Sequence, residues 1–224
     1  MQNLKKPQVI FFDWDNTLAL NRDVVVGAMN KVLAKYGKDD WEKTKKEKRD
    51  NNKSLKENFV NFFGVELEKQ AYNDYLNFYN EFSNLLKAPD NAKEMLKLLV
   101  DKGIKVIIVS NKERSLLLNE ISVLYSDINF YKIMANGDSE KNKPDASPIF
   151  KALENTNIEI NPKNVWIIGD SNQDIDCGYN AGIQPILYGK GKLAEAEYFE
   201  EKRKATPSMQ QIMDFEEIVE FSNK

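Results

Sequence analysis

The stretch PQVIFFDWDNTLAL, residues 7–20, ends an apolar run with two acids. Residues 9–12 are typical of a buried strand, and Asp13 follows them directly. Asp15 stands two positions further on, and Thr17 two beyond that. Neighbouring carboxylates repel one another, and both lose favourable hydration when they are buried. A group of opposite charge must therefore compensate them, and finding that group indicates the function.

The apolar runs that follow alternate with segments of helical spacing. Strand-like runs occur at residues 104–109, 128–135, 165–168 and 184–189. Helical patterns lie at residues 91–103, 112–125, 147–157 and 172–182. Because strands of consecutive apolar residues are buried on both faces, this alternation predicts an α/β fold. We expect a Rossmann-like parallel sheet core with helices on both sides.

One long segment interrupts this alternation. Residues 22–88 contain no strand-like run, and their apolar residues follow helical spacing at residues 24–37, 54–64 and 66–86. Pro89 marks the return to the α/β pattern. The sequence therefore predicts a core made of residues 1–21 and 89–224, with an all-helical domain of residues 22–88 inserted after the first strand.

Two other segments give weaker patterns. Residues 38–57 contain eight Lys or Arg and six Asp or Glu, which predicts a solvated helix or loop. A basic lip that attracts phosphorylated substrates is the alternative interpretation. Residues 192–224 are predicted to be helical, with a break near Pro207.

The composition limits the possible partners and compartments. The 224 residues are 42% hydrophobic with a net charge of −3, so no global positive field favours nucleic acid or an anionic membrane. The longest apolar run is too short to cross a bilayer, and the N-terminal residues lack the apolar part of a secretory signal. With a single cysteine, these features predict a cytoplasmic protein with no nucleic-acid or membrane partner.

The chain contains no histidine, which excludes several chemistries. Ser-His-Asp and Cys-His catalysis, phosphohistidine chemistry and histidine-bound zinc all require that residue. Cys177 lacks the downstream arginine of a cysteine phosphatase, because Ile183 stands at that spacing, and Cys177 is predicted to pack in the core. Carboxylates, hydroxyls, lysines and hard cations remain.

Polar residues follow several of the predicted strands. They are Asp13, Asp15, Thr17, Ser110, Asn111, Lys143, Asp170, Ser171 and Asp174. In parallel sheets, ligands bind beyond the carboxyl ends of the strands, so we expect these side chains to meet. Clustered carboxylates suit Mg²⁺, and a lysine with hydroxyl and amide donors suits a phosphoryl group. Without histidine or a reactive cysteine, a carboxylate is the natural nucleophile.

Four motifs in this order resemble those of the haloacid dehalogenase superfamily. They are DWDNTL, VSN, KPDASPIFKAL and GDSNQDIDCGYNAG. The resemblance spans residues 8–188, and the helical insertion resembles the C1 cap of the phosphoglycolate phosphatase-like branch. Asn16 stands where many relatives have glycine, but asparagine tolerates the positive φ of a tight turn. Trp14 replaces a more common Phe or Leu, and we expect it to pack in the core.

The resemblance implies roles for four acids. Asp13 would attack phosphorus and form an aspartyl-phosphate. Asp15 would protonate the leaving oxygen and then activate water, while its backbone carbonyl binds Mg²⁺. Asp13 and Asp170 would be carboxylate ligands of Mg²⁺, and Asp174 would support them or coordinate through water.

The resemblance also implies which residues bind substrate. Ser110 would donate a hydrogen bond to a phosphate oxygen, with help from the Asn111 amide. Lys143 would balance the charge of Asp13 and the phosphoryl group. Thr17 completes the predicted substrate-binding set.

The implied function is a Mg²⁺-dependent phosphatase acting on a small phosphorylated metabolite, a phosphate monoester. A β-phosphoglucomutase-like phosphomutase also keeps both acids and is an alternative, as is a non-catalytic Mg²⁺ and phosphate-binding regulatory module. Asp15 disfavours a dehalogenase, which lacks the second acid. A phosphonatase would need a Schiff-base lysine from the insertion, where no lysine stands out.

Overall fold

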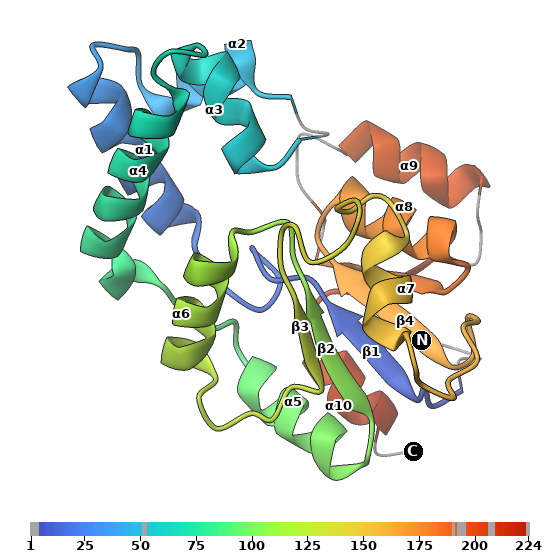
Figure 1. Ribbon diagram of the computed structural model, residues 1–224. Coiled ribbons are helices and arrows are strands. Elements are labelled where there is room, and N and C mark those ends of the chain that lie inside the picture. Colours follow the sequence, from blue (N-terminus) through green and yellow to red (C-terminus); the bar gives the residue numbers. More distant parts are fainter. Residues whose placement is uncertain (1–4, 51–52, 190, 192–195, 206–208, 223–224) are drawn as a thin grey trace. The chain divides into compact units, whose positions relative to one another are not determined.

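The residues before Asp13 form a central strand of the sheet in the computed structural model (Figure 1). Within the described residues, which are 5–50, 53–189, 191, 196–205 and 209–222, six parallel strands follow the order β3-β2-β1-β4-β5-β6. They are β1 (Val9–Phe12), β2 (Lys105–Val109), β3 (Lys132–Met134), β4 (Val165–Gly169), β5 (Gln184–Tyr188) and β6 (Gln210–Ile212). Because β1 lies between β2 and β4, the segments that follow these three strands emerge side by side.

Helices cover both faces of the sheet. They are α5 (Ala92–Asp101), α6 (Arg114–Leu124), α7 (Ser147–Leu153), α8 (Asn172–Ala181), α9 (Ala196–Ala205) and α10 (Glu216–Ser222). Val9 and Phe11 belong to a buried cluster with residues of α7 and α8. Phe12 points to the other face, where its ring meets Phe215 at 6.1 Å beside α10. No helix in the described part of the chain is long and apolar enough to cross a membrane.

The chain divides into two compact units. One contains residues 1–19 and 88–224 with the sheet, and the other contains residues 20–87. The second unit consists of α1 (Arg22–Lys35), α2 (Trp41–Lys48), α3 (Leu55–Phe63), α4 (Glu68–Glu81) and the 3₁₀ turn η1 (Ser83–Leu85).

Aromatic side chains form the core of the helical unit. Phe59 contacts Phe62, Phe63, Tyr72 and Tyr75, with ring centroids 4.9–6.1 Å apart. Spacings of three and four residues place these rings on one face of α3 and one face of α4. The aromatic residues of the helical unit are therefore largely packing residues.

The predicted α/β fold with a helical insertion is confirmed, but the C-terminal prediction was wrong in part. Residues 210–212, expected to be helical, form strand β6 at the edge of the sheet. Three residues are too few to show the alternation of a strand, and pairing with β5 decides their conformation. Pro207 lies outside the described residues. The charged segment 38–57 contains a helix, α2, whose Trp41 and Thr44 are buried.

The turn after β1 is held by its own backbone and by the tyrosine that follows α6. The Trp14 carbonyl accepts hydrogen bonds from the amides of Thr17, Leu18 and Ala19 at 2.9–3.2 Å. Asn16 takes a φ of 62°, which agrees with the expectation for asparagine at a tight turn. Tyr125, which follows α6, donates its hydroxyl to the Leu18 carbonyl at 2.6 Å.

Replacing Tyr125 with Phe should destabilise the protein by about 1–2 kcal/mol, because the buried Leu18 carbonyl loses its donor. Tyr131→Phe is the matched control, since Tyr131 is 49% exposed and should change stability little. Chemical denaturation of both variants measures the difference. Equal stabilities would show that the Tyr125 hydroxyl does not hold this turn.

Candidate active site

The polar residues that follow β1, β2 and β4 come together at the carboxyl edge of the sheet. Asp13 extends β1, and its amide donates to the Ile168 carbonyl of β4 at 2.8 Å. Ser110 follows β2, and Asp170 follows β4. All three residues are at least nine-tenths buried. The parallel register therefore delivers two acids and a hydroxyl to one place.

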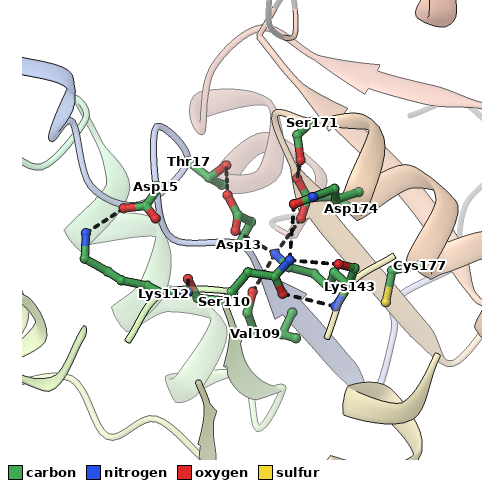
Figure 2. A network of polar contacts seen from close by, with 12 residues as sticks. Asp13, Asp15, Thr17, Val109, Ser110, Lys112, Lys143, Ser171, Asp174 and Cys177 are labelled. Carbon is green, nitrogen blue, oxygen red and sulfur yellow. Dashed lines mark hydrogen bonds and ion pairs between the residues drawn. The ribbon is translucent and has the colours of Figure 1, made fainter. Parts of the chain in front are cut away.

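Lys143 is the centre of this group (Figure 2). Its Nζ donates to Asp13 Oδ1 at 2.6 Å, to Asp174 Oδ1 at 2.6 Å and to the Val109 carbonyl at 2.8 Å. Burial alone lowers the pKa of Lys143, but the negative charges of Asp13 and Asp174 outweigh burial and raise it well above its usual range. The ammonium group therefore stays charged although it is buried.

The surroundings of Asp13 disfavour its charged form, whereas those of Lys143 favour its charged form. Burial and the nearby charge of Asp174 raise its pKa to about 6, although Lys143 works in the other direction. Thr17 donates its hydroxyl to Asp13 Oδ2 at 3.2 Å. Asp13 therefore sits where its negative charge is costly, and a further positive group would stabilise the carboxylate.

Asp174 belongs to this site although it lies on a helix. Its Oδ2 accepts from the Ser171 amide at 3.0 Å and from the Ser171 hydroxyl at 2.6 Å, while Oδ1 contacts Lys143. The side chain is fully buried. Asp176, two residues further on, instead contacts Tyr198 and Lys202 of α9.

Three of these acids can approach a common cation. Asp13, Asp170 and Asp174 each offer a carboxylate oxygen, and the three oxygens lie within 4.8 Å of one another. Oxygen-only donors suit Mg²⁺, and the cluster contains more negative charge than Lys143 balances. The residues present therefore fit a hard divalent cation. The carboxylate of Asp15 is not part of this cluster.

Asn111 holds the backbone of Lys143. Its Oδ1 accepts from the Lys143 amide at 3.0 Å, and its Nδ2 donates to the Lys143 carbonyl at 2.8 Å. The Ser110 hydroxyl accepts from the Lys112 amide at 3.1 Å. The side chain of Asn111 thus ties the loop after β2 to the loop that carries Lys143, a contact that the motif alone does not predict.

Sequence reasoning missed Lys112 and Glu120. Lys112 Nζ contacts Asp15 Oδ1 at 2.8 Å and Glu120 Oε1 at 2.9 Å, and the Trp14 indole donates to Glu120 Oε2. A signal for Glu120 was present, because it falls at helical spacing from the buried Leu116 and therefore on the apolar face of α6. A buried acid on such a face needs a partner.

Residues 10–188 match the family of haloacid dehalogenase-like hydrolases. The protein belongs to this family. All four motifs lie within the matched range, and the geometry above describes how this member of the family arranges them.

The chain is also similar to individual proteins. A Caldanaerobacter subterraneus protein named "Putative pyrophosphatase PpaX" is 30% identical over 121 residues, covering 54% of this chain and about half, 53%, of that protein. Phosphoglycolate phosphatase from Aquifex aeolicus is 29% identical over 196 residues, covering 80% and 84%. The crystal structure of a predicted phosphoglycolate phosphatase from Haemophilus somnus has a TM-score of 0.78 at 18% identity, covering 96% and 98%, and supports the fold alone.

In this hydrolase, the predicted site residues separate into two groups. Lys143 joins Asp13 and Asp174, Thr17 contacts Asp13, and Asp170 completes the acidic cluster. Asp15 is instead paired with Lys112 (Figure 2). Cys177 is buried in the core cluster, and burial raises the pKa of its thiol to about 12, so it stays protonated.

Replacing Gly169 with Ala should displace Asp174 and weaken cation binding. A Cβ atom at this position would lie 2.2 Å from Asp174 Cγ, a distance that both residues cannot keep. We expect Mg²⁺ affinity to fall about 10- to 100-fold, as measured by calorimetry. Asp176→Asn on the same helix is the control and should bind Mg²⁺ normally. Unchanged affinity in the Gly169 variant would exclude Asp174 from the cation site.

The pKa of Asp13 predicts how stability depends on pH in metal-free protein. Its raised pKa means that the stability contribution of Asp13, full below about pH 4, is lost as the pH rises through about 6. Asp13→Asn should therefore become more stable than wild type above about pH 7, by up to about 3 kcal/mol. Asparagine keeps an oxygen that can accept from Lys143.

Asp127→Asn is the control of opposite sign. Contacts with Lys93 and Lys97 lower the pKa of Asp127 to about 2, so this substitution should reduce stability at neutral pH. Urea unfolding across the pH range, with a chelator present, measures both variants. A stability difference between Asp13→Asn and wild type that does not grow with pH would contradict the raised pKa of Asp13.

Proposed function

We propose that the protein is a Mg²⁺-dependent phosphatase that hydrolyses a small phosphate monoester through a phosphorylated Asp13. The observation that carries this proposal is the buried Lys143, which contacts both Asp13 and Asp174 next to Asp170. A lysine paired with two carboxylates at an oxygen-rich site provides what phosphoryl transfer needs: a nucleophile, a fixed positive charge and cation ligands.

The reaction proceeds in two steps. Asp13 attacks phosphorus, the ester P–O bond breaks, and the leaving oxygen takes a proton from Asp15. Water then attacks the phosphorus and gives a proton to Asp15, and the Asp13–phosphorus bond breaks. The products are an alcohol and inorganic phosphate, and both acids return to their starting states.

The cation site supports this scheme. Asp13, Asp170 and Asp174 would hold Mg²⁺, with the backbone carbonyl of Asp15 as a further ligand. The ion would supply positive charge next to the phosphoryl oxygens and the ionised Asp13. Lys143 would supply a second positive charge that remains in place throughout the reaction.

Other side chains would bind the phosphoryl group. Ser110 would donate its hydroxyl to a phosphate oxygen, and the Asn111 backbone amide would donate to another. Thr17 would orient Asp13 through the hydrogen bond from its hydroxyl. The side chain of Asn111 would keep Lys143 in register, since it contacts both backbone groups of that residue.

The helical unit would act as a cap that excludes bulk water and selects the leaving group. We assign this role to residues 22–88, with residues 1–21 and 89–224 as the catalytic core. The names of the two relatives suggest which substrates to test first. Phosphoglycolate and pyrophosphate both present a terminal phosphoryl group on a small anion.

The proposal predicts Mg²⁺-dependent phosphate release that requires Asp13. Wild type, Asp13→Asn and Asp170→Asn would be assayed against phosphoglycolate, pyrophosphate and a panel of sugar and alkyl phosphates. Asp13→Asn should reduce release to the level of the enzyme-free control, and EDTA should do the same to wild type. Asp170→Asn should need more Mg²⁺ for half-maximal rate.

Asp127→Asn makes the same chemical change at a surface ion pair and should keep wild-type activity. Phosphate release by Asp13→Asn at the wild-type rate would refute the nucleophile. If no substrate releases phosphate but a sugar phosphate is isomerised, the protein is a phosphomutase. Tight Mg²⁺ and phosphate binding without turnover would instead favour the regulatory module.

A further inference from the structure

Asp15 belongs to a closed ring of polar contacts with Trp14, Glu120 and Lys112. The Trp14 indole donates to Glu120 Oε2, Glu120 Oε1 contacts Lys112 Nζ at 2.9 Å, and Lys112 Nζ contacts Asp15 Oδ1 at 2.8 Å. The backbone closes the ring, because Trp14 and Asp15 are consecutive residues. Two neighbours in the turn after β1 are thus attached to the same ion pair.

The ion pair in this ring is buried. The side chains of Lys112 and Glu120 are only 7% and 2% exposed, and Trp14 is fully buried. The loss of hydration on burying two charges can exceed the free energy gained from their attraction, unless both groups are also well hydrogen-bonded. The Asp15 side chain is different, because it remains 41% exposed and therefore accessible to solvent.

Asp13 and Asp15 are held by different lysines. Asp13 contacts Lys143, whereas Asp15 turns to Lys112 on the other side (Figure 2). Asp15 therefore has a positive partner outside the acidic cluster.

We propose that Lys112, fixed by Glu120 and Trp14, is a positioning residue that holds the carboxylate of Asp15 apart from the cation cluster and aimed at the leaving group. The catalytic part of this inference rests on the phosphatase function proposed above. In this scheme Lys112 is neither a ligand of the cation nor a contact of the phosphorus atom. It acts through Asp15, whose proton transfer requires a carboxylate placed within hydrogen-bond reach of the leaving oxygen.

Crystal structures test the positional part without any turnover. In Lys112→Met the Asp15 carboxylate should leave its present place, whereas in Lys112→Arg it should stay. Lys112→Met combined with Glu120→Gln removes both buried charges and provides a second variant that leaves no charge uncompensated. An unmoved Asp15 in both methionine variants would overturn the proposal, even if the protein has no phosphatase activity.

Kinetics test the catalytic part. Loss of Asp15 positioning should slow cleavage of an alkyl phosphate, because its leaving oxygen needs a proton. It should slow cleavage of p-nitrophenyl phosphate much less, because that leaving group is stable as an anion. In single turnover, Lys112→Met should slow alcohol release about 10- to 100-fold and leave p-nitrophenolate release nearly unchanged. Lys112→Arg should restore most of the rate, and KM should change little.

A double-mutant cycle shows whether Lys112 acts through Asp15. Adding Lys112→Met to Asp15→Asn should cause no further loss with the alkyl phosphate. Lys97→Met removes a lysine from a surface ion pair and is the control expected to behave as wild type. Additive losses, or equal losses with both substrates, would reduce Lys112 to a structural residue. Turnover that survives Asp13→Asn would instead refute the phosphatase scheme itself.

Discussion

The contact on which the site depends is that of Lys143 with Asp13 and Asp174. One ammonium group uses three donors on partners from three places: the end of β1, the end of β2 and the start of α8. A buried lysine is stable only when its charge is matched, and two carboxylates match it here. Without Lys143, two buried carboxylates would lose their compensating charge, so the segments that carry Asp13, Val109 and Asp174 are energetically linked.

The sheet order creates the crowding that Lys143 relieves. Since β1 lies between β2 and β4, Asp13, Ser110 and Asp170 emerge next to one another. Asp174 adds a further carboxylate from the first turn of α8, directly against Gly169, where any side chain would collide with it. The acids therefore outnumber the lysine, and burial together with the nearby charge of Asp174 raises the pKa of Asp13. The protein therefore gathers negative charge at a place where the residues present fit a hard divalent cation.

The sequence could predict the parts of this arrangement that depend on local pattern. Strands such as residues 9–12 and 165–168 are apolar throughout, and the polar residues after them follow from parallel topology. Strand β6 was not predictable, because three residues paired at a sheet edge carry no period. The contacts of Asn111 with Lys143, and of Lys112 with Glu120, join residues from different loops or from a loop and a helix. Spacing along the chain gives no measure of such distances, although an acid on the apolar face of α6 was a sign that a partner existed.

Lys143 and Lys112 each compensate one of the two acids that follow β1, but the two ion pairs differ in burial. Lys143 is buried against Asp13, and moving it away would leave the Asp13 carboxylate buried without a positive partner at this contact. Its charge therefore compensates that of Asp13 permanently. Lys112 pairs with a carboxylate that is still 41% exposed, so water competes for Asp15 and the attraction between them is weaker. A nucleophile benefits from the first arrangement, because its geometry must not change while charge moves to phosphorus. An acid–base group benefits from the second, because it must exchange protons with substrate and solvent while its position stays defined. The difference in burial between the two pairs therefore corresponds to the different chemistry proposed for the two acids that follow β1.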